Sequence, residues 1–263
     1  MEVEQALDLI GSASQRYDTV RAALRYRGDG AAHKEIRERI VSTEAGRQAF
    51  RISPREAAEA AGRPDAHPPS DGPFGWRCRA WYAGKYRERL ETEVPGGGVN
   101  ISAVNGRARS DLPPHALCPE YDYWFWRHRV GAGPREDDPR WFWLAEDHYW
   151  TFYALLTDEI CGISGELSRL DLTVEGPVTW AGREAWRLVG VPGEEWDWAW
   201  DPDPLSWGAD EYEVIVDAER GVLLRVASRL RGADFNALEV EEIHFDERFG
   251  REVFDARQPL PWR

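Results

Sequence analysis

Residues 212–225 read YEVIVDAERGVLLR and contain the pattern that decides the fold. An apolar run ends at the polar segment Asp217–Arg220, and a second apolar run begins after Gly221. Glycine closes such a turn readily because it adopts positive φ without a steric penalty. The pattern therefore predicts an antiparallel hairpin of two strands, Tyr212–Val216 and Val222–Leu230.

Similar strand and turn signals lie on both sides of this hairpin. We predict further strands at Leu170–Val174, Glu184–Val189 and Leu238–Phe245, which complete a β-meander over residues 170–258. Gly, Pro and Asp mark the connections, because these residues favour turn geometry. The expected turns are Glu175-Gly176-Pro177, Ala181-Gly182, Asp217–Gly221 and Arg231-Gly232.

A first meander is predicted over residues 76–112. Its strands are Trp76–Tyr82, Tyr86–Thr92 and Val99–Val104, and Asn105-Gly106 follows the third strand. This dipeptide favours a two-residue type I′ turn, because both residues tolerate positive φ. We therefore expect a tight hairpin at that point.

Residues 113–169, between the two meanders, differ in composition. They combine Pro-rich breaks with dense aromatic residues, and Asp138-Pro139 is typical of the start of a short helix. We expect this region to interrupt the sheet and to form an aromatic-rich lid.

Residues 1–75 are predicted to contain helices and one strand. Apolar residues recur at steps of three and four within Val3–Tyr17, which is the period of an amphipathic helix. A strand over Val20–Tyr26 and a charged, helix-prone stretch over Ala31–Ala49 follow. The capping box at Ser53–Glu56 predicts one more helix.

The length and composition indicate one soluble domain, and the predicted helices and antiparallel meanders place it in the α+β class. The chain has 263 residues with 47 acidic and 33 basic side chains, and its net charge of −14 repels nucleic acids and anionic membrane surfaces. The first residues are acidic where a secretory signal is positive, and no apolar stretch approaches the roughly 20 residues that cross a bilayer. Three cysteines without close spacing fit reduced thiols. We therefore expect a cytoplasmic protein with no nucleic-acid partner and no membrane span.

Three segments of the second half resemble a known superfamily. They are GREAWRL at 182–188, YEVIVDAERGVLLR at 212–225 and FDE at 245–247. Over residues 170–254 the chain is similar to the LolA, LolB and RseB-like group of lipoprotein carriers and sigma-factor regulators, particularly its actinobacterial members of unknown function. The resemblance implies a strongly curved antiparallel sheet, a half-open barrel, with helices packed over its concave face and an apolar cavity between them.

The same resemblance implies binding rather than a reaction. In the carriers the cavity holds acyl chains, and in the regulators a similar domain senses lipid or misfolded-protein signals and contacts a partner protein. This chain has no export signal and no lipidation cysteine near its start, so only the binding role is expected to carry over.

Tryptophan is unusually frequent, with 14 residues. Trp196, Trp198 and Trp200 alternate, so in a strand they would project from one face. Such a stripe either packs into the core or lines a surface for a ligand or a partner. Alternation predicts ligand-facing positions on the strands and at the opening of the cavity: Trp81, Trp186, Leu188, Val214 and Val216 on strands, and Trp143, Trp150 and Trp198 at the opening.

Metal and acid–base sites have little support. His115 and Cys118 have ligand-like spacing, but no second pair of ligands occurs, so we expect no metal. Acidic neighbours beside tryptophans suggest a glycoside hydrolase, yet sequence neighbours on a strand point to opposite faces. These acidic pairs are Glu146-Asp147, Asp158-Glu159 and Glu194-Glu195.

Two glycine-containing motifs also lack the residues that their chemistry requires. Gly162–Gly165 is one residue short of a nucleophile elbow, and Pro95–Gly98 lacks the lysine of a phosphate-binding loop. The sequence therefore predicts a non-catalytic half-barrel without cofactors that binds an apolar ligand, such as an acyl chain or a lipid. The alternative is a protein-binding regulator whose cavity is filled by its own helices, and a glycoside hydrolase is a remote third.

Overall fold

The computed structural model describes residues 1–42, 72–84, 87–94, 98–105, 125–130, 155–156, 163–193, 205, 208–254 and 260. Ten strands of this part of the chain form one sheet in which every neighbouring pair is antiparallel. The strands are β1 (Val20–Asp29), β2 (Pro73–Tyr82), β3 (Arg87–Val94), β4 (Gly98–Asn105), β5 (Phe125–Val130), β6 (Leu170–Trp180), β7 (Arg183–Pro192), β8 (Glu211–Asp217), β9 (Leu223–Leu230) and β10 (Ala233–Phe245).

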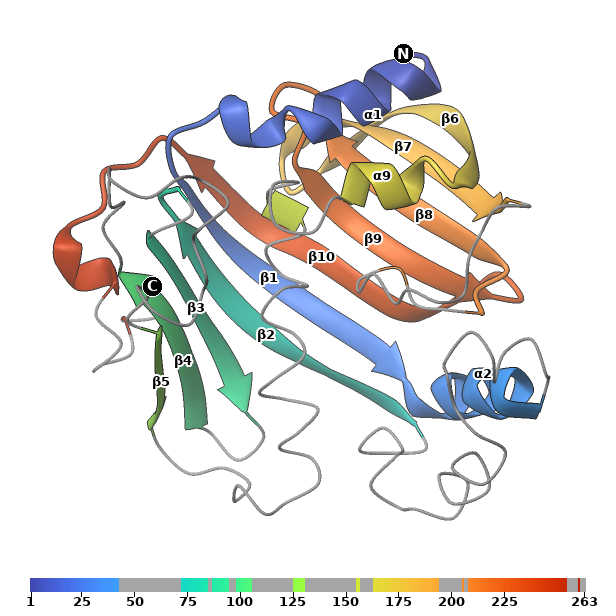
Figure 1. The fold of residues 1–263 in the computed structure, drawn as a ribbon, viewed down its shortest axis with the longest axis horizontal. Helices are drawn as coiled ribbons and strands as arrows, with labels where there is room; N and C mark the ends of the chain where they lie inside the picture. Colours follow the sequence, from blue (N-terminus) through green and yellow to red (C-terminus); the bar gives the residue numbers. More distant parts are fainter. Residues whose placement is uncertain are drawn as a thin grey trace, which may run out of the picture.

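The two predicted meanders belong to one sheet, joined where β1 pairs with β10. The order is β5-β4-β3-β2-β1-β10-β9-β8-β7-β6, so β1 pairs with both β2 and β10. Figure 1 shows this central position of β1. The predicted α+β class and the strongly curved, half-open antiparallel sheet are confirmed.

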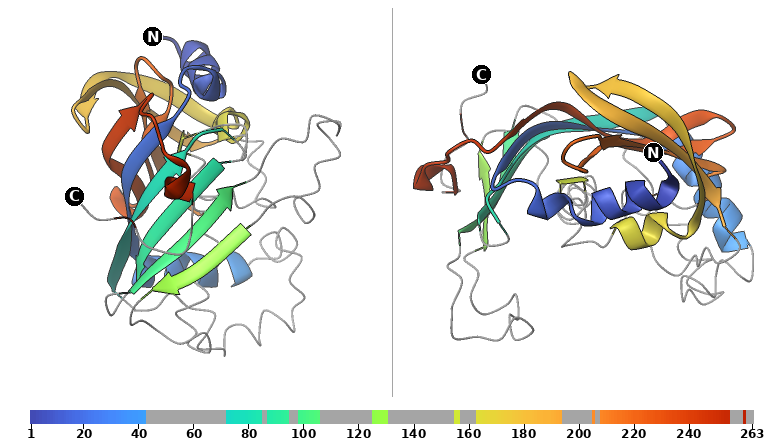
Figure 2. Two further views of the ribbon diagram at one scale, coloured as in Figure 1. Left: turned by 90° about the vertical axis from the view of Figure 1, so that its left-hand side faces the viewer. Right: turned by 90° about the horizontal axis from the view of Figure 1, so that it is seen from above.

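Helices lie on the concave side of the sheet (Figure 2). They are α1 (Val3–Gly11), followed by the 3-10 turn η1 (Ala13–Gln15), and the short α9 (Ile163–Leu167). The capping box of α1 includes a hydrogen bond from the Glu2 backbone N–H to Gln5 Oε1, at 2.9 Å. Two further helical segments are α2 (Gly30–Ser42) and the 3-10 turn η4 (Arg251–Phe254). No helix within the described ranges is long and apolar enough to cross a membrane.

Alternation along β1 separates an apolar face from a charged face. On β1, Val20, Ala22, Leu24 and Tyr26 are buried, whereas the arginines between them point to the opposite side. We call the concave, helix-covered face the inner face and the opposite one the outer face. The core therefore lies between the inner face and the helices.

Three of the four predicted turns in the second meander are confirmed, and one is wrong. Ala181 and Gly182 have φ values of 47° and 75°, as a tight hairpin turn requires. Glu175-Gly176-Pro177 is not a turn but part of the continuous strand β6. The register of β6 against β7 shifts between Val174 and Gly176, so Glu175 is the extra residue of a β-bulge. Pro177 is tolerated because β6 lies at the edge of the sheet.

The predicted tight hairpin at Asn105-Gly106 is also wrong. The next described strand that pairs with β4 is β5, which begins only at Phe125. The sequence after Gly106 reads RARSDLPP, and its charges and two prolines do not supply a returning strand. Because β5 comes from the aromatic-rich region 113–169, that region extends the sheet rather than interrupting it. The expected helices after Ser53 and near Asp138 lie outside the described residues.

Candidate functional site

Four of the predicted ligand-facing residues lie together on the inner face. Leu188 pairs with Val214, and Trp186 pairs with Val216, across β7 and β8. Leu188, Val214 and Val216 are 0% exposed, and Trp186 is partly buried against the same core. That core also contains Ala6 and Ile10 of α1, and Ile163 and Leu167 of α9.

This part of the inner face is packed rather than hollow. A side chain that borders a space of water size or larger retains some accessible surface. The 0% exposure of Leu188, Val214 and Val216 therefore means that no such space touches them. At these three positions the inner face packs against the core rather than against an empty space.

The expected inward orientation of Trp81 is wrong. Its neighbours across the strands are Arg21 of β1 and Arg89 of β3, which belong to the outer face. Residues Trp76, Cys78, Ala80 and Tyr82 of β2 occupy the inner face instead. Trp143, Trp150 and Trp198 lie outside the described residues.

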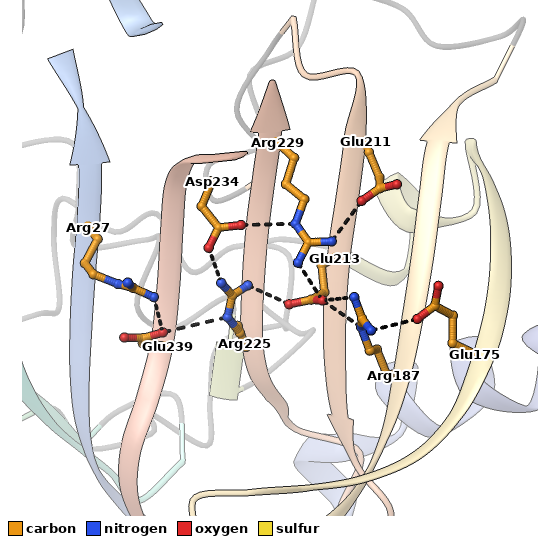
Figure 3. Close-up of polar contacts among 9 residues, drawn as sticks. All are labelled: Arg27, Glu175, Arg187, Glu211, Glu213, Arg225, Arg229, Asp234 and Glu239. Carbon is orange, nitrogen blue, oxygen red and sulfur yellow. Dashed lines mark hydrogen bonds and ion pairs between the residues drawn. The ribbon is translucent and has the colours of Figure 1, made fainter. Parts of the chain in front are cut away.

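The outer face carries a continuous layer of ion pairs across the second half of the sheet, shown in Figure 3. Glu213 is its centre: Arg187 Nε lies 2.7 Å from Glu213 Oε2, and Arg225 Nη1 lies 2.8 Å from Glu213 Oε1. Arg229 Nη2 adds a third contact, at 2.7 Å from Glu213 Oε2. The arginine–carboxylate layer consists of Arg27, Glu175, Arg187, Glu211, Glu213, Arg225, Arg229, Asp234 and Glu239.

The centre of this layer is buried although it lies on the outer face. The side chains of Arg225 and Glu213 are only 6% and 7% exposed. Burial on its own raises the pKa of Asp234, but the nearby guanidinium groups of Arg225 and Arg229 outweigh it and lower that pKa below its usual value. A carboxyl group whose pKa is lowered in this way is not suited to general acid catalysis.

A second buried cluster of charged side chains lies on the outer face of β2 and β3. Arg89 and Glu91 are 0% exposed, and Arg79 pairs with Glu91. Arg89 Nε also bonds Glu91 Oε1, at 2.9 Å. The guanidinium carbons of Arg79 and Arg89 lie 5.2 and 5.9 Å from the ring centroid of Trp81.

Residues 248–254 and 260, which we call the C-terminal strap, contact this group. The Leu260 backbone N–H donates to Glu91 Oε1 at 2.8 Å, and Arg79 Nη2 donates to the Leu260 carbonyl oxygen at 2.6 Å. Sequence reasoning missed this site. The available signal was charge at every second position of β3, from Arg87 to Glu93, but its burial depends on a segment far away in the sequence.

An open depression of about 590 Å³ lies beside β1 and β2. Three arginines and three acidic residues line it, so its charge favours neither anions nor cations. Two of these arginines already pair with glutamates: Arg27 with Glu239 at 2.8 Å, and Arg77 with Glu241 at 3.1 Å. The depression therefore indicates no ligand class.

Metal-binding groups do not occur among the described residues: no cluster of three or more His, Cys, Asp or Glu side chains is arranged for a metal. His115 and Cys118 lie outside that part of the chain, as do the three acidic pairs beside tryptophans. Cys78 is buried on the inner face, and burial raises the pKa of its thiol well above the usual value. Such a thiol is unreactive at neutral pH.

Comparison with known proteins gives fold relatives only. No protein-family model and no curated protein matches the sequence. The crystal structure of MucB matches with a TM-score of 0.50 and 12% identity, covering 97% of this chain and 62% of that one. The Pseudomonas aeruginosa MucA/MucB complex matches with a TM-score of 0.48 and 11% identity, covering 97% and 60%.

A LolA-superfamily protein from Nitrosomonas europaea matches with a TM-score of 0.29 and 7% identity, covering 97% of this chain and 98% of that one. This chain spans about 60% of the length of the MucB chains that it matches. At these identities the likeness concerns the fold alone. The chain adopts the fold of MucB.

Proposed function

We propose that this chain is a non-catalytic protein-binding domain whose inner face is filled by its own helices. The observation that carries the proposal is the 0% exposure of Leu188, Val214 and Val216, which leaves no space for an acyl chain against β7 and β8. This favours the second of the two functions that the sequence left open. The fold is compatible with either, since it occurs in MucB, which has been solved with MucA, and in LolA-superfamily proteins.

The absence of catalysis is part of the same proposal. A glycosidase needs one carboxyl group that is protonated near neutral pH and a second that acts on the substrate. In the arginine–carboxylate layer, Glu211 and Glu213 each accept hydrogen bonds from Arg229, and Asp234 pairs with Arg225. These carboxylates are therefore suited to holding strands together.

Native mass spectrometry after mild purification, with added fatty acids and phospholipids, tests the proposal directly. We expect the wild-type protein to appear at its bare mass under conditions in which serum albumin retains fatty acid. Stoichiometric retention of an acyl ligand would overturn the proposal.

Overpacking supplies a second test that does not depend on choosing the right ligand. Val214→Phe adds volume where the inner face is packed, so we expect it to cost about 1–3 kcal/mol of the free energy of unfolding. Val191→Phe, at a site on β7 that is 44% exposed, is the matched control and should change it by less than about 0.5 kcal/mol. A Val214→Phe protein as stable as the control would indicate a hollow and contradict the proposal.

A further inference from the structure

The first half of β6 is an open strand edge at the end of the sheet (Figure 1). Among the described residues, β6 pairs with β7 on one side and with no strand on the other. Closer to the hairpin turn, the bulge at Glu175 interrupts the edge, and Pro177 has no N–H to offer. Leu170–Val174 precede both features, so this stretch keeps the regular main chain that a further strand needs for pairing.

One contact fixes which main-chain groups point to this edge. The N–H of Ala218, which follows β8, donates to the Glu184 carbonyl oxygen at 3.0 Å, so Glu184 directs its main-chain groups toward β8. Successive residues of a strand direct these groups to opposite sides, so the odd-numbered residues of β7 direct theirs toward β6. Their partners on β6 include Asp171 and Thr173, whose main-chain groups therefore face β7. The residues that direct their N–H and C=O groups to the open edge are Leu170, Leu172 and Val174.

The side chains along this edge alternate between polar and aliphatic groups. Asp171, Thr173 and Glu175 are exposed, and Glu175 marks their side as the outer face because it pairs with Arg187 there, at 2.9 Å. Leu172 and Val174 are half-buried on the inner face, where they pack against the core. The edge thus offers carboxylates on one face and aliphatic surface on the other.

We propose that Leu170–Val174 bind an extended segment of a partner protein as an added antiparallel strand, in which basic side chains alternate with aliphatic ones. The inference rests on the proposed protein-binding role and names its site and the kind of segment that it takes. The main-chain groups of Leu170, Leu172 and Val174 supply hydrogen bonds that any strand can take up, and the side chains on the two faces supply specificity.

The geometry of a strand pair assigns each face of the partner segment. Side chains directly opposite each other in an antiparallel pair have Cβ atoms about 4.5–5.5 Å apart. A lysine or arginine opposite Asp171 can therefore reach its carboxylate on the outer face. An aliphatic residue opposite Leu172 extends the core on the inner face and removes further apolar surface from water.

Charge favours such a segment over a second copy of this chain. A second β6 would bring two more carboxylates to the outer face beside Asp171 and Glu175, and like charges on neighbouring strands destabilise a sheet. Each copy also carries a net charge of −14, which opposes self-association. The same carboxylates attract a basic strand, so they select one partner and reject the other.

Fluorescence anisotropy with the full chain and the labelled peptides KVKVKVK and EVEVEVE tests the charge. The two peptides share their aliphatic residues, and we expect KVKVKVK to bind at least tenfold more tightly. Asp171→Lys in the chain should weaken the binding of KVKVKVK at least threefold. Glu184→Lys, at an exposed position of the same hairpin, makes the same change of charge and is the matched control, which should bind as the wild type does.

Two N-methylated forms of KVKVKVK separate strand addition from simple charge attraction. In the proposed antiparallel pair, the valine N–H groups face β6, because each valine lies opposite one of the residues that direct their main-chain groups to the edge. The lysine N–H groups point away from the sheet. We expect the peptide that is N-methylated at its three valines to bind the wild-type chain at least tenfold more weakly than the one N-methylated at its last three lysines. This comparison needs no variant of the chain, so it does not depend on whether Asp171→Lys folds.

Equal binding of the two N-methylated peptides would overturn the proposal, and so would equal binding of KVKVKVK and EVEVEVE. Stronger binding of the valine-methylated form would overturn the antiparallel arrangement. A concentration-dependent dimer of the wild-type chain in light scattering that KVKVKVK dissociates would also overturn it, since the edge would then belong to a second copy.

These outcomes are distinct from those that test the proposed function. Retention of a lipid by the wild-type chain sinks the proposed protein-binding role, whereas binding of the peptides at β6 remains measurable. Failure of KVKVKVK to bind sinks the strand site and leaves the packed inner face unaffected.

Discussion

Trp180 Nε1 donates a hydrogen bond of 3.0 Å to the carbonyl oxygen of Val240, although three strands lie between β6 and β10 in the sheet. The guanidinium carbon of Arg225 on β9 lies 5.5 Å from the Trp180 ring centroid. The tip of the β6–β7 hairpin thus folds back over the outer face, as the view from above in Figure 2 shows. This cover explains why Arg225 is buried on a face that otherwise carries charged residues.

The Trp180 contact should be measurable as stability. Trp180→Phe keeps an aromatic ring but removes the N–H, so we expect a loss of about 1 kcal/mol in the free energy of unfolding by urea. Trp186→Phe changes the same residue type within the same hairpin and is expected to cost less than about half of that. Equal losses would show that the hydrogen bond to Val240 contributes nothing.

Two glycines with the same backbone conformation separate conformational strain from close packing. Gly221 and Gly182 have φ values of 76° and 75°, where a side chain is disfavoured in both cases. A Cβ on Gly182 meets open space, whereas a Cβ on Gly221 would lie 2.1 Å from the Leu9 carbonyl oxygen of α1.

We expect Gly182→Ala to cost about 1–2 kcal/mol, because only the left-handed conformation opposes it. Gly221→Ala should cost at least about 2 kcal/mol more, since α1 must shift away from the turn between β8 and β9. Thermal and urea unfolding of both variants give the comparison. Similar losses for the two would contradict the close approach of α1.

The buried centre of the arginine–carboxylate layer should respond very differently from an exposed ion pair outside the layer. Arg225→Met leaves the buried carboxylate of Glu213 without one of its partners, and we expect a loss of about 3–5 kcal/mol. Arg77→Met, whose side chain is 54% exposed beside Glu241, should cost less than about 1 kcal/mol. Adding Glu213→Gln to Arg225→Met should recover part of the loss, and a purely additive double variant would show that the pair is not coupled.

The local pattern of the sequence was sufficient to predict the strands, but not to predict which segments pack over them. The hairpin over residues 212–225 was predictable because its turn residues and apolar alternation act between neighbours in the chain, and β8 and β9 confirm it. The same alternation could not assign Trp81 to the outer face, because large aromatic residues are normally expected in the core. In sequence, Arg89 and Glu91 have the pattern of a solvated face. Their burial could not be predicted, because the strap that contacts them lies more than 150 residues away in the chain.

The bulge in β6 was missed for the opposite reason: the local sequence indicated a turn where the structure has a continuous strand. Gly-Pro within residues 175–177 fits a turn locally, and only the ten Cα pairs between β6 and β7 extend the strand through it. The register of the hairpin is set by the positive φ of Ala181 and Gly182. Strand pairing in this register therefore outweighs the local preference for a turn. Strand alternation likewise identifies which side chains face inward, but not what packs against them.

Stability should fall on the acid side because of carboxylates whose pKa is lowered in the folded state. For Asp234, burial opposes the shift, but the guanidinium groups of Arg225 and Arg229 lower its pKa below the ordinary value of 3.8. A hydrogen bond with His244, together with Arg21, lowers the pKa of Glu242, and Arg21 lowers that of Glu247. A carboxyl group with a lowered folded-state pKa stabilises the protein above its unfolded-state pKa, and this contribution is lost as the pH falls through the folded-state value.

We therefore expect the urea midpoint to be level near neutral pH and to decline from about pH 4.5 downward. Asp234→Asn should be less stable than the wild type at pH 7, because Arg225 and Arg229 lose an ionised partner. Its midpoint should decline less steeply between about pH 4 and pH 2.5, because one of the groups that must take up a proton is gone. Glu4→Gln, at an exposed position of α1, serves as the control and should follow the wild-type curve. If the Asp234→Asn and wild-type curves run parallel over the whole range, the Asp234 carboxylate does not contribute to stability through Arg225 and Arg229.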